Sequence, residues 1–305
     1  MLYPNNQINL FGFEKLFNEL TTLYNNDKFP NKILFTGQKG IGKSTLSYHL
    51  INSILSKGEE LSYDFKNYKI NNQNKTFKLI QNKTHPNFNL IDVLPEKKNI
   101  DINQIRNLLS KFNKSSFNSK PRFILIDNIE FLNINSINAL LKFLEEPSVN
   151  TYFILIHNHK VIPNTLRSRC LEFKIFFSND EMMKISNKLL EGNIFDLINN
   201  ELLNYYITPG KIYCLLQFCL ENDINIKDIS LSNFLKLIID KGYYKKSILM
   251  STLIYDFIEI FLSKNFKQNY NSIANDFLKK INDMKKYNLD EESFFINFKN
   301  NVLHG

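Results

Sequence analysis

A glycine-rich segment at residues 37–45 limits this chain to a small set of folds. Its sequence is Gly-Gln-Lys-Gly-Ile-Gly-Lys-Ser-Thr, which matches the phosphate-binding loop motif. A short apolar run at 32–36 precedes it, and a helical pattern at 44–55 follows. The motif requires this order of strand, loop and helix. We therefore expect a parallel sheet with crossover helices around the loop.

The loop residues predict a nucleotide site that uses ATP with Mg²⁺. Glycines let consecutive backbone N–H groups curl around phosphate oxygens, the lysine reaches the outer phosphates, and the serine hydroxyl ligates Mg²⁺. The predicted nucleotide-binding residues here are Gly37, Gly40, Gly42, Lys43, Ser44 and Thr45.

A second apolar run, at 123–126, ends at Asp127 and predicts a buried central strand. Ligands gather at the carboxyl ends of such strands, so Asp127 is predicted to complete Mg²⁺ coordination together with Ser44. The alternative role for Asp127 is a helix cap or loop residue. Asn128 follows where an ATPase usually carries glutamate, and an amide cannot accept a proton from water. The pattern predicts a chain that holds nucleotide and hydrolyses it poorly or not at all.

Strand and helix patterns alternate through about residue 175, and only helical patterns follow. This predicts an α/β domain at 1–175, a helical lid domain at 176–222 and a C-terminal helical collar or oligomerisation domain at 223–305. The Asn-rich segment 57–83 has no clear period and is predicted to be an insertion or long loop. Besides those around the loop, the expected helices are 10–24, 102–112 and 135–146, and the expected strands are 88–93, 123–126 and 152–156.

The composition of the chain limits its possible partners, location and metal sites. The net charge of +8 fits either a nucleic-acid partner or a solvated basic surface, because a bias toward Asn, Lys, Ile and Phe scatters lysine along the chain. No apolar stretch reaches about 18 residues, and no signal-peptide pattern is visible, so a cytoplasmic location without a membrane span is predicted. The three cysteines form no Cys-x-x-Cys pair, which argues against a zinc site.

Arginine is informative in a chain this rich in lysine. Only four of the 38 basic residues are arginines, namely Arg106, Arg122, Arg167 and Arg169. A retained arginine suggests a need for the planar, forked guanidinium. Two of the four lie within one hexapeptide, residues 165–170.

Three segments now point to a family. They are Ile-Asp-Asn-Ile-Glu-Phe-Leu-Asn at 126–133, Asn-Ala-Leu-Leu-Lys-Phe-Leu-Glu-Glu-Pro at 138–147 and Thr-Leu-Arg-Ser-Arg-Cys at 165–170. Together they closely resemble the bacterial clamp-loader AAA+ proteins of DNA polymerase III, most of all the delta-prime family. Residues 10–14, 85–86 and 102–106 are also similar. The resemblance is dense over about 9–175 and rests only on order and size beyond.

The resemblance implies a hetero-pentamer with gamma/tau-type and delta-type subunits, which opens a sliding clamp and places it on primed DNA. Arg169 matches the arginine that reaches into a neighbouring subunit's ATP site as an arginine finger in trans. Its alternative role is a surface ion pair. Thr208-Pro-Gly-Lys211 resembles the second sensor of the lid domain, with Lys211 where many relatives carry arginine. Its alternative is an ordinary helix N-terminus.

Two departures from the family matter. Residues 45–120 contain no cysteine, so the zinc module of many relatives is absent and no zinc is expected. Asn128 agrees with delta-prime proteins, some of which have lost the phosphate loop that is intact here. The resemblance thus implies a stator with little or no ATP hydrolysis of its own. The alternatives are a gamma/tau-like motor subunit and an unrelated P-loop ATPase or kinase.

Overall fold

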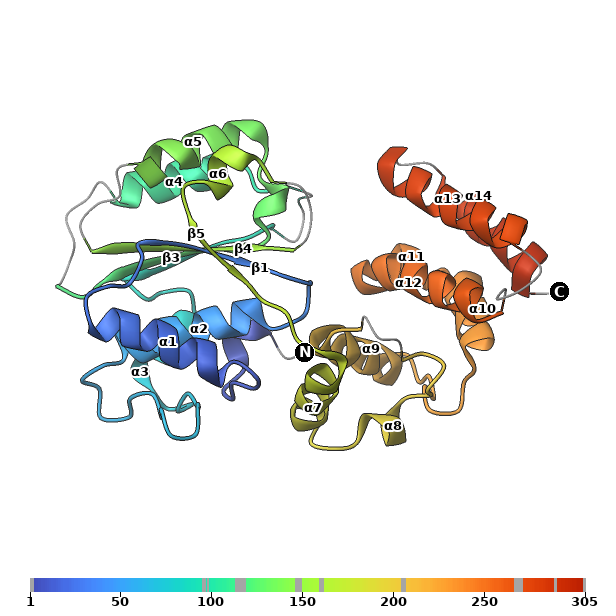
Figure 1. Cartoon of the computed structure of the whole chain (residues 1–305), viewed down its shortest axis with the longest axis horizontal. Helices are drawn as coiled ribbons and strands as arrows, with labels where there is room; N and C mark the ends of the chain where they lie inside the picture. The colour runs from blue at the N-terminus through green and yellow to red at the C-terminus, as the bar shows by residue number, and fades with distance from the viewer. Residues whose placement is uncertain are drawn as a thin grey trace. The chain divides into compact units, whose positions relative to one another are not determined.

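Five parallel strands form one sheet in the order β2-β3-β4-β1-β5 (Figure 1). The computed structural model describes residues 3–94, 97, 99–112, 119–145, 150–158, 162–203, 207–265, 271–287 and 290–303. The strands are β1 (Lys32–Thr36), β2 (Phe88–Ile91), β3 (Arg122–Ile126), β4 (Thr151–His157) and β5 (Leu171–Lys174). Every pairing between neighbours in the sheet is parallel.

The three central strands are buried along almost their whole length, as their apolar runs predict. Strand β5 was not predicted. It lies at an edge, and the charged side chains of Glu172 and Lys174 interrupt its apolar residues. An edge strand needs no continuous apolar run, because solvent reaches part of it. The sequence therefore carries no strong signal for β5.

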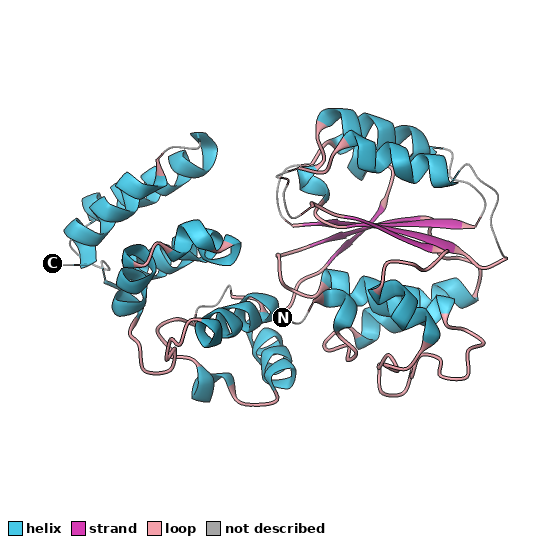
Figure 2. Ribbon diagram, turned by 180° about the vertical axis from the view of Figure 1, so that it is seen from behind, coloured by secondary structure: helices cyan, strands magenta, loops and turns pink. Residues whose placement is uncertain are grey.

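Helices cover both faces of the sheet (Figures 1 and 2). One face carries α1 (Glu14–Asn25), α2 (Lys43–Leu55) and α3 (Lys75–Gln81), and the other carries α4 (Ile102–Phe112), α5 (Ile134–Glu145) and α6 (Asn164–Arg167). Each layer buries its own apolar cluster against the sheet, with Phe17 and Leu50 on the first face and Leu108 and Leu140 on the second. Residues 146 and 147, where the helix after 135 was predicted to end, lie outside the described residues.

The prediction of a loop at 57–83 is wrong in part, because the segment contains α3 and contributes to the core. Tyr63, Ile70 and Phe77 are each at most 5% exposed. Asn74 caps α3, since its Oδ1 accepts a hydrogen bond from Phe77 N at 2.7 Å. The Asn-rich composition hid these apolar residues, whose burial depends on contacts with distant helices.

Beyond residue 176 the regular elements among the described residues are all helices, as predicted. The elements are α7 (Asn179–Leu190), α8 (Ile194–Leu197), α9 (Pro209–Glu221), α10 (Leu231–Asp240), α11 (Tyr243–Lys246), α12 (Ile248–Asn265), α13 (Asn271–Tyr287), α14 (Glu291–Phe298) and a final π-helix (Lys299–Leu303). Short 3-10 helices occur at Pro4–Asn6 and Ile129–Phe131. The predicted fold class, a parallel-sheet α/β domain followed by helices, is confirmed.

The chain divides into two compact units. The first comprises Met1–Leu189 with Thr208–Gly210, and the second comprises Leu190–Ile207 with Lys211–Gly305. The division into domains at 1–175, 176–222 and 223–305 stays a prediction. Within the described ranges, none of the helices has the length and apolar character needed to span a bilayer.

Candidate nucleotide-binding site

The phosphate-binding loop connects the carboxyl end of β1 to the start of α2. Gly40 and Gly42 have φ values of +83° and +106°, a region that residues with a Cβ rarely adopt. Gly42 is the N-cap residue of α2, and Lys43 is its first residue. The backbone of the loop therefore leads directly into the N-terminus of α2. At such a terminus the helix dipole and the unpaired backbone N–H groups favour the binding of an anion. Thr45 is the third residue of α2 and partly exposed.

The Lys43 side chain is curled inside this loop. Its Nζ donates hydrogen bonds to Gly37 O at 2.8 Å and to Gln38 O at 2.7 Å, and the residue is only 3% exposed. Burial lowers the pKa of Lys43 to about 8, against the opposing attraction of Asp127 and Glu130. A phosphate group would supply the negative charge that favours the protonated amine.

The two predicted Mg²⁺ ligands are in contact, although they are 83 residues apart in sequence. Ser44 Oγ donates to Asp127 Oδ2 at 2.5 Å. Burial raises the pKa of Asp127 to about 6, and repulsion from Asp92 adds to this, while the hydrogen bond from Ser44 opposes it. A hydroxyl and a carboxylate beside a phosphate-binding loop are the hard oxygen ligands that Mg²⁺ prefers, so the residues fit the ion.

Asn128 uses both ends of its side-chain amide. Its Nδ2 donates to Asp92 Oδ1 at 2.8 Å, and its Oδ1 accepts a hydrogen bond from Asn158 Nδ2 at 3.0 Å. Its backbone N–H donates to Asp127 Oδ1 at 2.8 Å, and its φ of +56° is one that asparagine tolerates better than most residues. The amide therefore links the ends of three strands. A carboxylate at this position could not donate to Asp92.

Sequence reasoning missed three residues of this site, namely Asp92, Glu130 and Asn158. Asn158 donates from its backbone N and its Nδ2 to the Glu130 carboxylate, at 3.3 and 3.1 Å. Asp92 and Asn158 closely follow the carboxyl ends of β2 and β4, and Glu130 lies just beyond Asp127. A polar side chain soon after a buried parallel strand is the available signal, because these strand ends form the ligand edge of an open α/β sheet.

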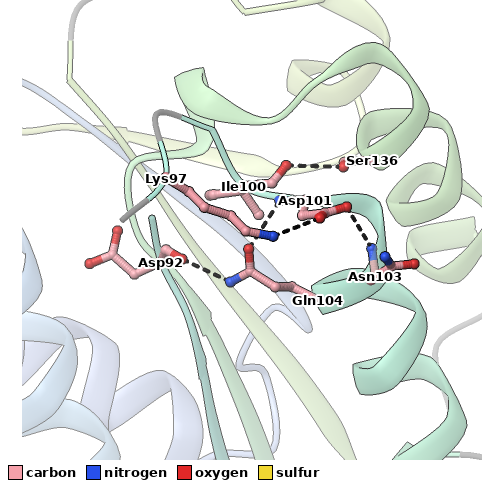
Figure 3. Close-up of polar contacts among 7 residues, drawn as sticks. All are labelled: Asp92, Lys97, Ile100, Asp101, Asn103, Gln104 and Ser136. Atoms are coloured by element: carbon pink, nitrogen blue, oxygen red, sulfur yellow. Dashed lines mark hydrogen bonds and ion pairs between the residues drawn. The ribbon is translucent and has the colours of Figure 1, made fainter. Parts of the chain in front are cut away.

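A second set of hydrogen bonds holds the backbone of Asp92 in place (Figure 3). Gln104 Nε2 donates to Asp92 O at 2.9 Å, and Gln104 Oε1 accepts from Asp101 N at 3.0 Å. Asp101 Oδ1 in turn accepts from Asn103 N at 3.1 Å, so Asp101 and Gln104 form a capping box at the start of α4. In the segment that leads into α4, Ile100 O accepts a hydrogen bond from Ser136 Oγ of α5 at 3.2 Å. These contacts give a structural role to Gln104, one of the polar residues in the segment 102–106 that carries part of the resemblance.

The segment Thr208–Gly210 contacts the phosphate-binding loop within the first unit. Thr208 Oγ1 donates to Lys39 O, and Gly210 N donates to Gly40 O, each at 2.8 Å. Lys211 belongs to the second unit, where its Nζ lies 2.7 Å from Asp256 Oδ2. A role for Lys211 in nucleotide binding stays a prediction.

The two arginines of residues 165–170 have separate partners. Arg167 forms a bidentate ion pair with Glu172, in which Nε donates to Oε2 at 2.8 Å and Nη2 donates to Oε1 at 2.9 Å. Glu172 Oε1 also accepts a hydrogen bond from Thr36 Oγ1. Arg169 contacts Glu145 at the end of α5 and the carbonyl of Thr165. The side chain of Arg169 is therefore hydrogen bonded within its own unit, and it is also partly exposed to solvent. The described residues contain no cluster of three or more His, Cys, Asp or Glu side chains that could hold a metal ion.

Comparison with known proteins gives one family for the part of the chain that carries the phosphate-binding loop, Asp127 and Arg169. Residues 12–178, more than half of the chain, match the sequence model of the family described as DNA polymerase III, delta subunit. The delta' subunit of Buchnera aphidicola subsp. Baizongia pistaciae is 31% identical over 49% of this chain and 45% of its own length. The delta' subunit of Buchnera aphidicola subsp. Schizaphis graminum is 27% identical over 90% of this chain and 84% of its own length.

Among solved structures, a DNA polymerase III gamma subunit-related protein from Thermotoga maritima is similar, with a TM-score of 0.44. It is 16% identical, and the alignment covers 91% of this chain and 96% of that protein.

Proposed function

Since the chain belongs to the DNA polymerase III delta subunit family of clamp-loader AAA+ proteins, we propose that it is the delta-prime-type stator of a clamp loader. In this role it binds nucleotide without hydrolysing it effectively, and it completes the ATP site of a neighbour. Its partners are gamma/tau-type and delta-type subunits in a hetero-pentamer, the sliding clamp and, through the complex, primed DNA. The cytoplasm is its proposed location, and the lid and collar domains are proposed at 176–222 and 223–305.

The hydrogen bonding of Asn128 carries this proposal. Hydrolysis needs a group that positions or deprotonates a water molecule. At this position the chain has an amide whose nitrogen donates to Asp92 and whose oxygen accepts from Asn158. The amide has no basic atom to offer to water. The arrangement supports a chain that stabilises one conformation of the site rather than one that turns over ATP.

The nucleotide-binding part of the proposal rests on the loop. Gly37, Gly40 and Gly42 allow backbone N–H groups to surround the phosphates, and Lys43 exchanges its two carbonyl partners for phosphate oxygens. Ser44 and Asp127 hold Mg²⁺, directly and through water. When bound, the ion neutralises phosphate charge. Thr45 and Lys211 are proposed as further contacts to the nucleotide.

Arg169 is proposed as the arginine finger that acts on a neighbouring subunit's nucleotide. Its side chain is 35% exposed, and a guanidinium can donate two parallel hydrogen bonds to one phosphate group. Such a group stabilises the charge that develops on the transferred phosphoryl group.

The experiment compares the isolated chain with a reconstituted assembly. Mixed with a gamma/tau-type ATPase, a delta-type subunit and a sliding clamp, the chain should co-elute in one complex, and clamp loading on primed DNA should require it. The isolated chain should show negligible ATP turnover. Steady turnover by the isolated chain that disappears in Lys43→Ala would instead identify a motor subunit. Clamp loading that proceeds equally well without the chain would exclude the stator role.

A further inference from the structure

Arg169 is held by a carboxylate from another element of its own unit. Its Nε and Nη2 both donate to Glu145 Oε1, at 3.1 and 2.6 Å, and its Nη1 donates to Thr165 O at 2.8 Å. We propose that Glu145 is the positioning residue of Arg169, fixing one edge of the guanidinium so that the remaining N–H groups are aimed at an anionic phosphate of a neighbouring subunit. This inference rests on the proposed role of Arg169 in trans.

The two elements that meet here are anchored in the core. Glu145 is the last residue of α5, and Leu140 and Leu144 of the same helix have no exposed surface. The carbonyl of Leu144 also accepts a hydrogen bond from Lys32 Nζ at 3.0 Å, which ties this helix end to β1. Leu166 of α6, 1% exposed, belongs to the same apolar cluster. A side chain held between two such elements has little freedom to rotate.

The hydrogen bonds leave the guanidinium able to bind a second partner. A guanidinium carries five N–H groups. Three of them donate to Glu145 and Thr165, so one N–H remains on each terminal nitrogen, with no acceptor among the described residues. Two such groups in one plane match two oxygens of a phosphate. A lysine ammonium lacks this division into a held edge and a donating edge, which accounts for arginine in a chain so rich in lysine.

The same contact is a poor source of folding stability. The Arg169 and Glu145 side chains are 35% and 52% exposed, and ion pairs at such exposure contribute little. An effect of Glu145 on turnover would therefore come from the direction of the guanidinium. Orientation of a catalytic group is sensitive to small displacements, since a shift of about 1 Å can lower a rate by about a hundredfold.

The test uses the reconstituted loader with clamp and primed DNA, and rates are expressed per assembled complex. Glu145→Ala removes the acceptor, whereas Glu145→Gln keeps an oxygen that both N–H groups can reach. We expect Glu145→Ala to lower kcat for ATP on the order of tenfold with little change in KM, and Glu145→Gln to stay within about twofold of wild type. In an Arg169→Ala background, Glu145→Ala should have no further effect.

Matched variants separate this effect from the loss of any exposed ion pair. Lys245 and Glu292 form such a pair at 2.7 Å with 52% and 54% exposure, and Glu292→Ala should leave kcat per complex unchanged. If Arg169→Ala slows turnover but Glu145→Ala does not, the positioning role is wrong while the proposed function stands. A higher rate in both Glu145 variants would mean that Glu145 restrains Arg169, which also overturns the inference. If Arg169→Ala itself has no effect, the proposed function fails first.

Discussion

The side-chain amide of Asn128 donates a hydrogen bond to the carboxylate of Asp92, with 2.8 Å between Nδ2 and Oδ1. This pair lies directly beside Asp127, whose pKa is already raised by burial and by the charge of Asp92. The side-chain amide joins Asp92 to Asn158 at this edge of the sheet, whereas a third carboxylate beside Asp92 and Asp127 would add repulsion. The residue that replaces the usual glutamate is therefore integrated into the site.

The first prediction concerns Asn128→Glu. We expect no gain of ATP turnover in the isolated chain, because no partner supplies an arginine. We also expect a loss of about 1–3 kcal/mol in the free energy of unfolding, because the bond to Asp92 is replaced by repulsion. Denaturant titration at neutral pH and a steady-state phosphate assay measure the two effects. Asn128→Ala, which adds no charge, should lose less stability. A stable Asn128→Glu chain with steady turnover would contradict this account.

The second prediction concerns Lys43→Ala. Titration calorimetry should detect weak binding of Mg-ATP to the wild-type chain and none to the variant. The substitution removes the amine that donates to Gly37 O and Gln38 O inside the loop and that would bind the phosphates. The matched control is Lys39→Ala. The Lys39 side chain is exposed. The hydrogen bond from Thr208 Oγ1 is accepted by the backbone carbonyl of Lys39, which the substitution to alanine keeps. Equal heats for wild type and Lys43→Ala would show that the loop no longer binds nucleotide.

The third prediction is a dependence of Mg-ATP affinity on pH. Mg²⁺ requires the ionised carboxylate of Asp127, whose pKa is about 6 in the ligand-free chain, so affinity should rise as pH increases through 6. Phosphate binding favours protonated Lys43, whose pKa is about 8, so affinity should fall as pH increases beyond 8. Calorimetry over a range of about four pH units centred on neutrality should show a maximum between the two values. In Asp127→Asn the limb near pH 6 should vanish, and its persistence would assign it to another group.

The fourth prediction concerns the close approach of Gly210 to the loop. A Cβ at Gly210 would lie 2.7 Å from Gly40 O and 2.9 Å from Gly40 Cα, so the backbone of one segment must move. We expect Gly210→Ala to cost about 1–3 kcal/mol of stability and to weaken Mg-ATP binding. Gly192→Ala is the control, because its Cβ would meet nothing nearer than 3.8 Å. Unchanged unfolding and binding in Gly210→Ala would show that this contact is dispensable.

The fifth prediction concerns Arg169→Ala in the reconstituted loader. Assembly should be nearly unchanged, while clamp-stimulated ATPase activity and clamp loading fall. Arginine fingers in trans contribute about 10³ to 10⁵ in rate, although several active sites in one assembly would mask part of the loss. Arg169→Lys should rescue poorly, because it restores charge without the fork. Arg167→Ala is the adjacent control, since Arg167 binds Glu172 in the same chain. Clamp loading at the wild-type rate by Arg169→Ala would leave the residue a purely structural role.

Local patterns were sufficient for a large part of the fold. The strand at 32–36 and the helix at 102–112 have the predicted bounds, because each is defined by the spacing of its own apolar residues. The loop at 37–45 and Asp127 also follow from short segments, since a phosphate-binding backbone and a strand end are local features. The apolar residues of α3 were overlooked, because their pattern is short and diluted by asparagine.

The sequence by itself determined which side chains lie at the ends of strands, and the tertiary structure decided which of them meet. Thr208 and Lys39 are 169 residues apart, and Asn128 and Asp92 are 36 apart, yet both pairs are hydrogen bonded. The order β2-β3-β4-β1-β5 brings the carboxyl ends of parallel strands to one edge of the sheet, and no local period encodes that order. Glu145 and Arg169 meet for a similar reason, because α5 and α6 bury their apolar residues in one cluster and so bring the two exposed charges together.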